Sequence, residues 1–415
     1  MQNIKKKSSK LDTERGFIAA EKVNFWRHAF PSRAATVCLI LLVVSSVALF
    51  AQSDEFMPSS SAGAGKLEVH SKFGGQIFGF DIDQSGTEGL LSESQLLSNG
   101  NVLAAVETFD QKTGKILKVV DKTETQDDFF TLGIVGKSVG LIEHEHEVSF
   151  LHLKRTFHVL NPLDSNQFTA VWTPPIGAKH IIMPTGVTRS QGVPNVAVFA
   201  YDNSGQFIPY VFSSNVAANT FGPVVKITDS NNFGSVPPPI AFDNETDQAV
   251  LGGGNGCFDC FPEIGVVDLA KGTFVEFTGI GFGFINGIAM DAADGIACTT
   301  TEDDASVEFY DLKKQTGFTV VLPNSQGLQF FSGADVEFDP IHKVFLVAQP
   351  NSSVSSGSTI YVYDTKGNVK ETLNGFSFSN VGNVIPMHIA LNPSKRNGFV
   401  DGPDGGVTEI QFFTY

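Results

Sequence analysis

A repeated pattern of short strands runs through this 415-residue chain. Each copy reads as a small apolar strand, a turn with Asp or Asn, a second strand ending in polar or Gly residues, and then a second pair of strands. The four clearest copies open with PIAFDNETDQAVLGGGNG (239–256), GIAMDAADGIACTTTEDD (287–304), DVEFDPIHKVFLVAQPNS (335–352) and HIALNPSKRNGFVDGPDG (388–405). Their spacing of roughly 45–55 residues is typical of units of four short strands. The chain is therefore predicted to form an array of small antiparallel sheets.

The first half of the chain follows the same pattern less closely. Three further copies span 77–120, 129–172 and 178–228, which brings the total to seven. A four-stranded sheet repeated radially is the blade of a β-propeller. The last copy is one strand short, and the alternating segment KLEVHSKF (66–73) can supply that strand, which would remove unpaired sheet edges. We therefore predict an all-β, seven-bladed β-propeller of four-stranded blades over residues 66–415, with its ring closed by an N-terminal strand.

The first 51 residues read as a targeting segment that precedes the propeller. They carry eight basic residues, and residues 34–51 are an uncharged apolar run that ends in Ala51. We expect either a signal peptide cleaved after Ala51 or a retained N-terminal membrane anchor. Residues 52–65 are small and polar, as in a flexible linker. Both readings place the propeller outside the cytoplasm, as a periplasmic, secreted or surface-anchored domain that touches a membrane only through residues 34–51, if these are uncleaved.

The charge balance limits the partners of this domain. The whole chain has 28 basic and 44 acidic residues; residues 1–51 hold 8 and 3 of them, which leaves 20 and 41, a net charge of −21. Such an acidic domain is a poor partner for nucleic acid or anionic lipid. We expect an unknown small ligand or a protein as its partner.

The repeats also resemble a known group of proteins. The YD phrases at Tyr310–Asp311 and Tyr363–Asp364 and the FDP and LNP turns are similar to those of seven-bladed propellers of the YVTN/NHL and lactonase-like type, often secreted in bacteria. The resemblance covers roughly residues 66–415. Members of the group include sugar-lactone hydrolases, binding proteins and surface proteins, so the resemblance implies a fold and leaves the function open.

The order of strands assigns the loops to two faces. The loops between the second and third strands share one face, here called the upper face, with the connections between blades. These loops are expected at 144–154, 256–263, 302–306, 350–358 and 401–406. They are longer and chemically richer than the opposite turns, so we expect any function at the upper face.

Two histidines in GLIEHEHEVSFLH (140–152) form a candidate metal site. His144 and His146 are two apart, so on a strand they point the same way and can hold Zn²⁺ if a third ligand joins them. His152, His388 and Asp401 are candidates for that ligand. The alternative is a polar strand end that enters a solvated loop.

Acidic loops and a cysteine pair offer further candidate sites. Asp303 and Asp304 in EDDAS, with Asp401 in DGPDGG, resemble oxygen-donor loops for Ca²⁺, although polar turn chemistry explains them equally well. Cys257 and Cys260 in GCFDCF are expected to form a small disulfide outside the cytoplasm, with a redox or zinc motif as the alternative. Cys298 is expected to be a buried apolar residue, or to pair with one of these two.

His388 stands at the start of an inner strand and is the first catalytic candidate, and His180 is the second. The structural alternative for His388 is a hydrogen bond to a neighbouring blade. The chain contains neither a GxSxG elbow nor an HExxH helix, which argues against a nucleophile-based hydrolase. The preferred hypothesis is an extracytoplasmic, non-catalytic scaffold that binds a ligand or a protein through its upper-face loops. The alternative is a lactonase-like hydrolase with a divalent cation, Ca²⁺ or Zn²⁺, at the channel mouth and His388 as base.

Overall fold

The computed structural model describes eighteen stretches of the chain. They are residues 63–125, 128–135, 139–149, 152–160, 170–172, 180–187, 195–202, 208–215, 220–227, 239–243, 246–253, 261–281, 285–301, 306–321, 335–349, 358–376, 388–401 and 409–415. These residues are mostly β-strand, and none of them belongs to an α-helix. The targeting segment and residues 52–62 of the expected linker lie outside the described residues, whereas Ala64 and Gly65, which were expected in the linker, already belong to the first strand. No helix among the described residues is long and apolar enough to cross a membrane.

The described strands form seven four-stranded antiparallel sheets. Six of them use four strands that are consecutive in the sequence. These are β2 (Gln76–Ile82), β3 (Glu88–Leu96), β4 (Val102–Asp110) and β5 (Ile116–Thr125); β6 (Asp128–Val135), β7 (Val139–Ser149), β8 (His152–Leu160) and β9 (Ala170–Trp172); β10 (His180–Val187), β11 (Asn195–Asp202), β12 (Ile208–Asn215) and β13 (Thr220–Lys226); β14 (Ile240–Asp243), β15 (Gln248–Gly253), β16 (Glu263–Asp268) and β17 (Thr273–Thr278); β18 (Ile285–Asp291), β19 (Ile296–Thr301), β20 (Ser306–Asp311) and β21 (Thr316–Val321); and β22 (Val336–Asp339), β23 (Val344–Gln349), β24 (Ser358–Asp364) and β25 (Val369–Phe376).

The seventh sheet combines strands from both ends of the described region. It contains β26 (Ile389–Asn392), β27 (Asn397–Asp401), β28 (Glu409–Thr414) and β1 (Ala64–His70), with the one-turn 3₁₀ helix η1 (Pro393–Lys395) between β26 and β27. β1 pairs with β28 so that His70 lies opposite Glu409, and the Gln411 side chain donates to the Gly65 carbonyl over 3.1 Å. The prediction that the segment at 66–73 supplies the missing outer strand is confirmed.

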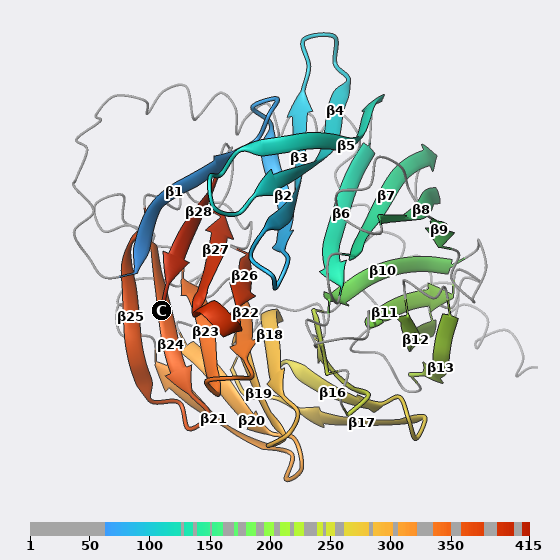
Figure 1. The fold of residues 1–415 in the computed structure, drawn as a ribbon. Helices are drawn as coiled ribbons and strands as arrows, with labels where there is room; N and C mark the ends of the chain where they lie inside the picture. Colours follow the sequence, from blue (N-terminus) through green and yellow to red (C-terminus); the bar gives the residue numbers. More distant parts are fainter. Residues whose placement is uncertain are drawn as a thin grey trace, which may run out of the picture. The chain divides into compact units, whose positions relative to one another are not determined.

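The sheets contact one another in a cyclic order. The first strand of each sheet contacts the first strand of the next, in the order β2, β6, β10, β14, β18, β22 and β26, and β26 contacts β2 again. In Figure 1 the labelled first strands β2, β6, β18, β22 and β26 lie toward the centre, and the later strands of their sheets lie farther out. The predicted four-strand repeat is therefore confirmed, and the arrangement is compatible with a propeller-like fold.

The hydrophobic core lies between neighbouring sheets. Strand residues alternate between the two faces of a sheet, so the unbroken runs of buried residues in β4 and β20 show that both faces of these strands are covered. Phe109 of β4 and Phe399 of β27 meet edge to face at 5.6 Å between ring centroids, and Phe309 of β20 meets Phe345 of β23 at 5.8 Å. All four rings are buried. Phenylalanine rings thus fill the space between sheets, where large buried rings contribute strongly to stability.

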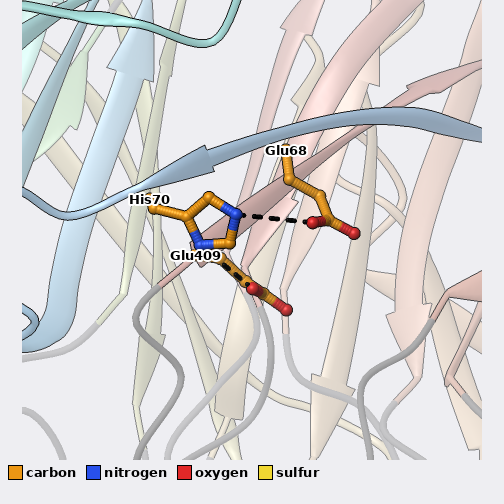
Figure 2. A group of neighbouring side chains, drawn as sticks. All are labelled: Glu68, His70 and Glu409. Carbon is orange, nitrogen blue, oxygen red and sulfur yellow. Dashed lines mark ion pairs between the residues drawn. The ribbon is translucent and has the colours of Figure 1, made fainter.

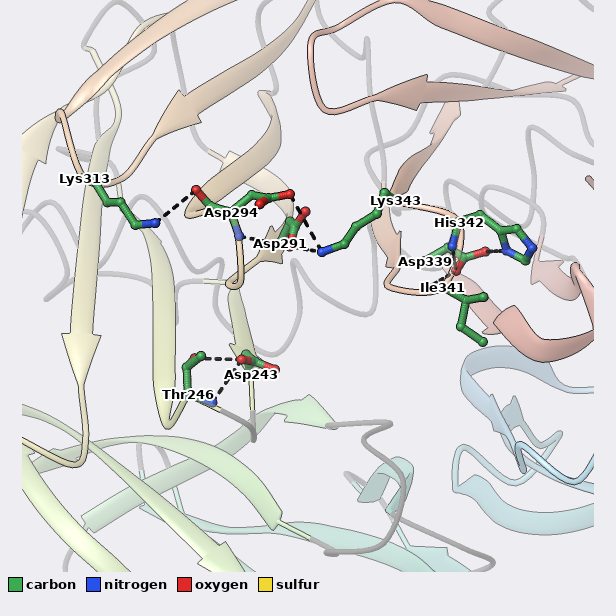
Figure 3. A network of polar contacts seen from close by, with 9 residues as sticks. All are labelled: Asp243, Thr246, Asp291, Asp294, Lys313, Asp339, Ile341, His342 and Lys343. Carbon is green, nitrogen blue, oxygen red and sulfur yellow. Dashed lines mark hydrogen bonds and ion pairs between the residues drawn. The ribbon is translucent and has the colours of Figure 1, made fainter.

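Polar contacts tie neighbouring sheets together at the turns after their first strands (Figure 3). The Lys343 ammonium, in the turn after β22, lies 2.8 Å from Asp291 at the end of β18. The Tyr415 hydroxyl, next to β28, donates over 2.8 Å to the buried carboxylate of Asp339. The end of β26 is also bonded to the turn after β2: the Gln84 side chain donates to the Leu391 carbonyl, and the Asn392 side chain donates to the Gln84 carbonyl. This edge of the sheets is consequently a set of short, mutually bonded turns, as the sequence predicted for the face opposite the long loops.

One predicted loop is instead largely strand. The upper-face loop expected at 144–154 is shortened, because β7 continues to Ser149 and β8 begins at His152. Each residue from Gly140 to Glu147 pairs with a residue of β8, so the ladder of backbone hydrogen bonds extends through the polar sequence. Backbone pairing does not require apolar side chains, which is why polarity alone misplaced this boundary.

Candidate functional site

A histidine and two aspartates meet at the upper edge of the last two sheets. His388 directly precedes β26, Asp401 is the last residue of β27, and Asp335 directly precedes β22. The His388 Nδ1 lies 2.9 Å from Asp401 Oδ2, and the His388 backbone N–H donates to Asp401 Oδ1 over 2.5 Å. The antiparallel pairing of β26 with β27 sets this meeting, because the start of one strand lies beside the end of the other.

Asp335 joins this pair from the neighbouring sheet. One of its carboxylate oxygens accepts the backbone N–H of Val336 over 2.9 Å, and the other accepts that of Ile389 over 2.8 Å. The first bond is local and the second crosses from one sheet to the next. Asp335 therefore fixes the start of β26, and with it the position of His388.

The two carboxylates hold His388 in its charged form. Burial by itself lowers the pKa of His388, but the charge of Asp401, its hydrogen bond and the nearby charge of Asp335 outweigh this and raise the pKa to about 9. Burial raises the pKa of Asp335, which the charge of His388 and the two backbone donors partly offset. At neutral pH the cluster is consequently an imidazolium between two carboxyl groups.

This arrangement favours recognition over proton abstraction. The His388 side chain is 39% exposed, whereas that of Asp401 is only 5% exposed. A charged imidazole donates hydrogen bonds from both ring nitrogens, and Asp401 already engages Nδ1. The remaining Nε2–H is thus suited to an acceptor on a ligand, whereas a base would need a neutral ring. Both oxygens of Asp401 are engaged by His388, so a cation there would have to compete with these bonds.

A second buried acidic pair lies in the first sheet and consists of Glu93 of β3 and Glu107 of β4. The two oxygens of Glu93 accept the backbone N–H groups of Phe73 over 3.0 Å and Gly75 over 2.7 Å. Glu107 accepts the N–H of Lys72 over 3.0 Å, while its other oxygen, Oε1, is buried without a hydrogen-bond partner among the described residues. The connection from β1 to β2 is therefore held by two carboxyl groups.

Close approach at this connection requires a glycine. A Cβ on Gly75 would lie 2.7 Å from the carbonyl oxygen of Ser94 and 2.8 Å from Glu93 Oε2. Burial raises the pKa of Glu107 to about 7; the Lys72 N–H opposes the rise, and the charge of Glu93 adds to it. Glu107 is thus poised to titrate close to neutral pH.

Sequence reasoning missed Asp335, Glu93 and Glu107. The signal for Glu107 was present, because it interrupts the otherwise mainly apolar strand VLAAVETFD, whose central residues are all buried. Glu93 lies in the more polar strand EGLLSESQL, which carried no such signal. The signal for Asp335 was its place directly before an inner strand. Neither pattern reveals which group each carboxylate contacts.

The remaining predicted residues are only partly described. His144 and His146 both lie on β7, opposite Phe130 and Asp128 of β6, and their side chains lie outside the described part, as does the side chain of His152. The pairs at 257 and 260 and at 303 and 304 also fall outside it. Cys298 is a free, fully buried thiol, as predicted, and burial raises its pKa.

Comparison of the sequence with protein-family models gives no match, and comparison with curated proteins gives none either.

Proposed function

We propose that residues 66–415 form a seven-bladed β-propeller of the YVTN/NHL or lactonase-like type that acts as a binding scaffold. The support for seven blades is the cyclic order of contacts among the first strands of the sheets, with β1 completing the last one. A closed ring of sheets leaves few strand edges without a partner. Residues 1–51 are proposed to direct this domain out of the cytoplasm, as a signal peptide or an anchor.

The observation that carries the proposed activity is the position of His388. It is a half-exposed imidazole whose orientation is fixed by Asp401, at the edge of the last sheet where β26 begins and β27 ends. A preorganised, charged donor that is half exposed is suited to bind a neutral, hydroxylated ligand or a carbonyl oxygen. The acidic surface of the domain disfavours anionic polymers.

The alternative, a lactonase-like hydrolase with a divalent cation, would use His388 as a base. A group with a pKa of about 9 is neutral in only about 1% of molecules at pH 7. Base catalysis there would be correspondingly weak, so we favour binding without turnover.

The test compares two histidines with similar surroundings at opposite edges of the sheets. His388 pairs with Asp401 at the upper edge, and His342 pairs through Nδ1 with Asp339 over 2.7 Å at the edge of the short turns. The full chain, His388→Gln and His342→Gln are screened by thermal shift against a panel of neutral oligosaccharides and sugar lactones. We expect ligands that raise the melting temperature of the wild type and of His342→Gln, and that do not raise that of His388→Gln.

The same panel separates the two functions. Sugar-lactone and ester hydrolysis is measured with added Ca²⁺ or Zn²⁺ and with a chelator. Turnover that the chelator abolishes would overturn the binding-scaffold proposal in favour of the hydrolase. Equal thermal shifts for His388→Gln and the wild type would remove His388 from the binding site.

A further inference from the structure

Three side chains that can bind a metal meet where the first strand pairs with the last (Figure 2). Glu68 and His70 are two apart on β1 and therefore share one face of the strand. Glu409, the first residue of β28, lies directly opposite His70. The His70 Nε2 lies 3.4 Å from Glu68 Oε2, and its Nδ1 lies 3.3 Å from Glu409 Oε2.

These separations suit a small tetrahedral cation. Zn²⁺ binds imidazole nitrogen and carboxylate oxygen at about 2.0–2.2 Å, so two ligand atoms of a tetrahedral site lie about 3.4 Å apart. Each distance from His70 is close to this value, but the two start from different ring nitrogens, so only one of them can belong to a given site. One ligand atom from each of the three residues lies within 4.8 Å of the other two. A single ion must bind one ring nitrogen, so one carboxylate has to turn toward it. The exposure of Glu68 and the half-burial of Glu409 leave room for this rotation.

The charge of the cluster favours a cation. Two carboxylates face one imidazole, so even a protonated His70 leaves one negative charge uncompensated. The carboxylates of Glu68 and Glu409 both face this ring and repel each other. A divalent ion would remove this repulsion between the two carboxylates.

We propose that Glu68, His70 and Glu409 form a Zn²⁺ site that clamps β1 to β28. Three protein ligands leave a fourth position for water. The ligands come from two strands that are far apart in the sequence and that pair only in the folded chain. Zinc binding therefore requires this pairing and stabilises it, because a ligand that binds only the folded state shifts the equilibrium toward it.

This site is separate from the metal sites expected from the sequence. His144 and His146 lie on β7 in the second sheet, whereas Glu68, His70 and Glu409 lie in the seventh. The function proposed for His388 does not involve the cluster.

The experiment measures Zn²⁺ binding to the full chain by competition with a chromophoric chelator, together with melting temperature in Zn²⁺ and in chelator. The variants are His70→Gln and Glu409→Gln. The controls are His342→Gln, a second exposed histidine paired with an aspartate, and the double variant His144→Ala/His146→Ala. All variants are also melted in chelator alone, which separates loss of zinc from loss of folding.

We expect the wild type to bind zinc and to melt at a higher temperature with it. Each ligand variant should lose at least about tenfold in zinc affinity, the lower limit of the loss seen when even an outer-shell partner is removed, and most of the rise in melting temperature. Both control variants should keep the zinc affinity and the rise in melting temperature of the wild type. Equal zinc affinity and an equal temperature rise in His70→Gln and the wild type would overturn the proposal, and so would loss of binding only in the His144→Ala/His146→Ala variant.

Discussion

Replacement of Glu107 by Gln should remove a pH dependence from the stability of this protein. Glu107 is fully buried beside Glu93, and its pKa rises from 4.5 to about 7. Between these two values the folded state keeps a proton that the unfolded state releases. The free energy of unfolding contributed by this group is therefore greatest below pH 4.5, falls as the pH rises, and levels off above pH 7.

The size of this effect follows from the same two values. A pKa difference of one unit corresponds to about 1.36 kcal/mol, so the rise to about 7 corresponds to about 3 kcal/mol over the whole range. Between pH 5 and pH 8 the loss is about 2.5 kcal/mol, because part of it has already occurred at pH 5. Gln keeps an oxygen that can accept the Lys72 N–H and carries no charge at any pH.

Urea unfolding of the wild type, Glu107→Gln and Glu93→Gln at pH 5, 6, 7 and 8 measures the effect. We expect the stability of the wild type to fall by about 2.5 kcal/mol more than that of Glu107→Gln across this range. Glu93→Gln is the contrasting variant. Its amide group would face one of the two backbone N–H donors that Glu93 now accepts, so it should lose about 2 kcal/mol or more at every pH.

Parallel pH profiles for the wild type and Glu107→Gln would refute this reasoning. Such profiles would mean that Glu107 ionises in the folded protein near its ordinary pKa. Water would then have more access to the Glu107 carboxyl group than its full burial implies. A Glu93→Gln variant as stable as the wild type would show that the connection from β1 to β2 does not depend on its carboxylate.

Two further predictions concern other polar pairs. NMR titration of the His388 ring should give a pKa of about 9, and this pKa should fall toward 6.5 in Asp401→Asn. The pair of His388 and Asp401 therefore stabilises the fold fully below pH 6.5, and this stabilisation is lost as the pH rises through 9. An unchanged His388 pKa in Asp401→Asn would contradict the assigned cause. Tyr415→Phe removes the hydroxyl that donates to the buried Asp339 carboxylate. Urea unfolding at pH 7 should show a loss of about 2 kcal/mol in the free energy of unfolding, since hydrogen bonds to charged groups contribute about this much. A loss below about 0.5 kcal/mol would show that the contact is dispensable.

The repeated sheets were readable from the sequence because their causes are local. An apolar strand, an Asp turn and a second strand recur within about 20 residues, and the turn after β18, where Asp291 stands, has this form. The partner of β1 was predicted only by counting strands, since nothing near Ala64 indicates β28. The extent of β7 was missed because backbone pairing continued through polar residues.

The site was less predictable than the fold. His388 and Asp401 were both singled out, yet as a base and a metal ligand, and not as partners of one another. Their contact arises from the register of β26 against β27, which the sequence leaves open by a residue or more. The contribution of Asp335 comes from a neighbouring sheet, and Glu68, His70 and Glu409 are brought together only by the pairing of β1 with β28.

The composition of the last sheet also bears on how the chain is made. Gln411 and Gly65, which are bonded across β28 and β1, are 346 positions apart. A ribosome adds about 5–20 residues per second, so the N-terminal strand waits tens of seconds before its partner exists. During that interval its backbone groups offer an edge to which other nascent chains can add. The interval before β28 is synthesised is therefore the stage of biosynthesis at which misassembly is most favoured, and the stage at which chaperone binding to the nascent chain would protect it.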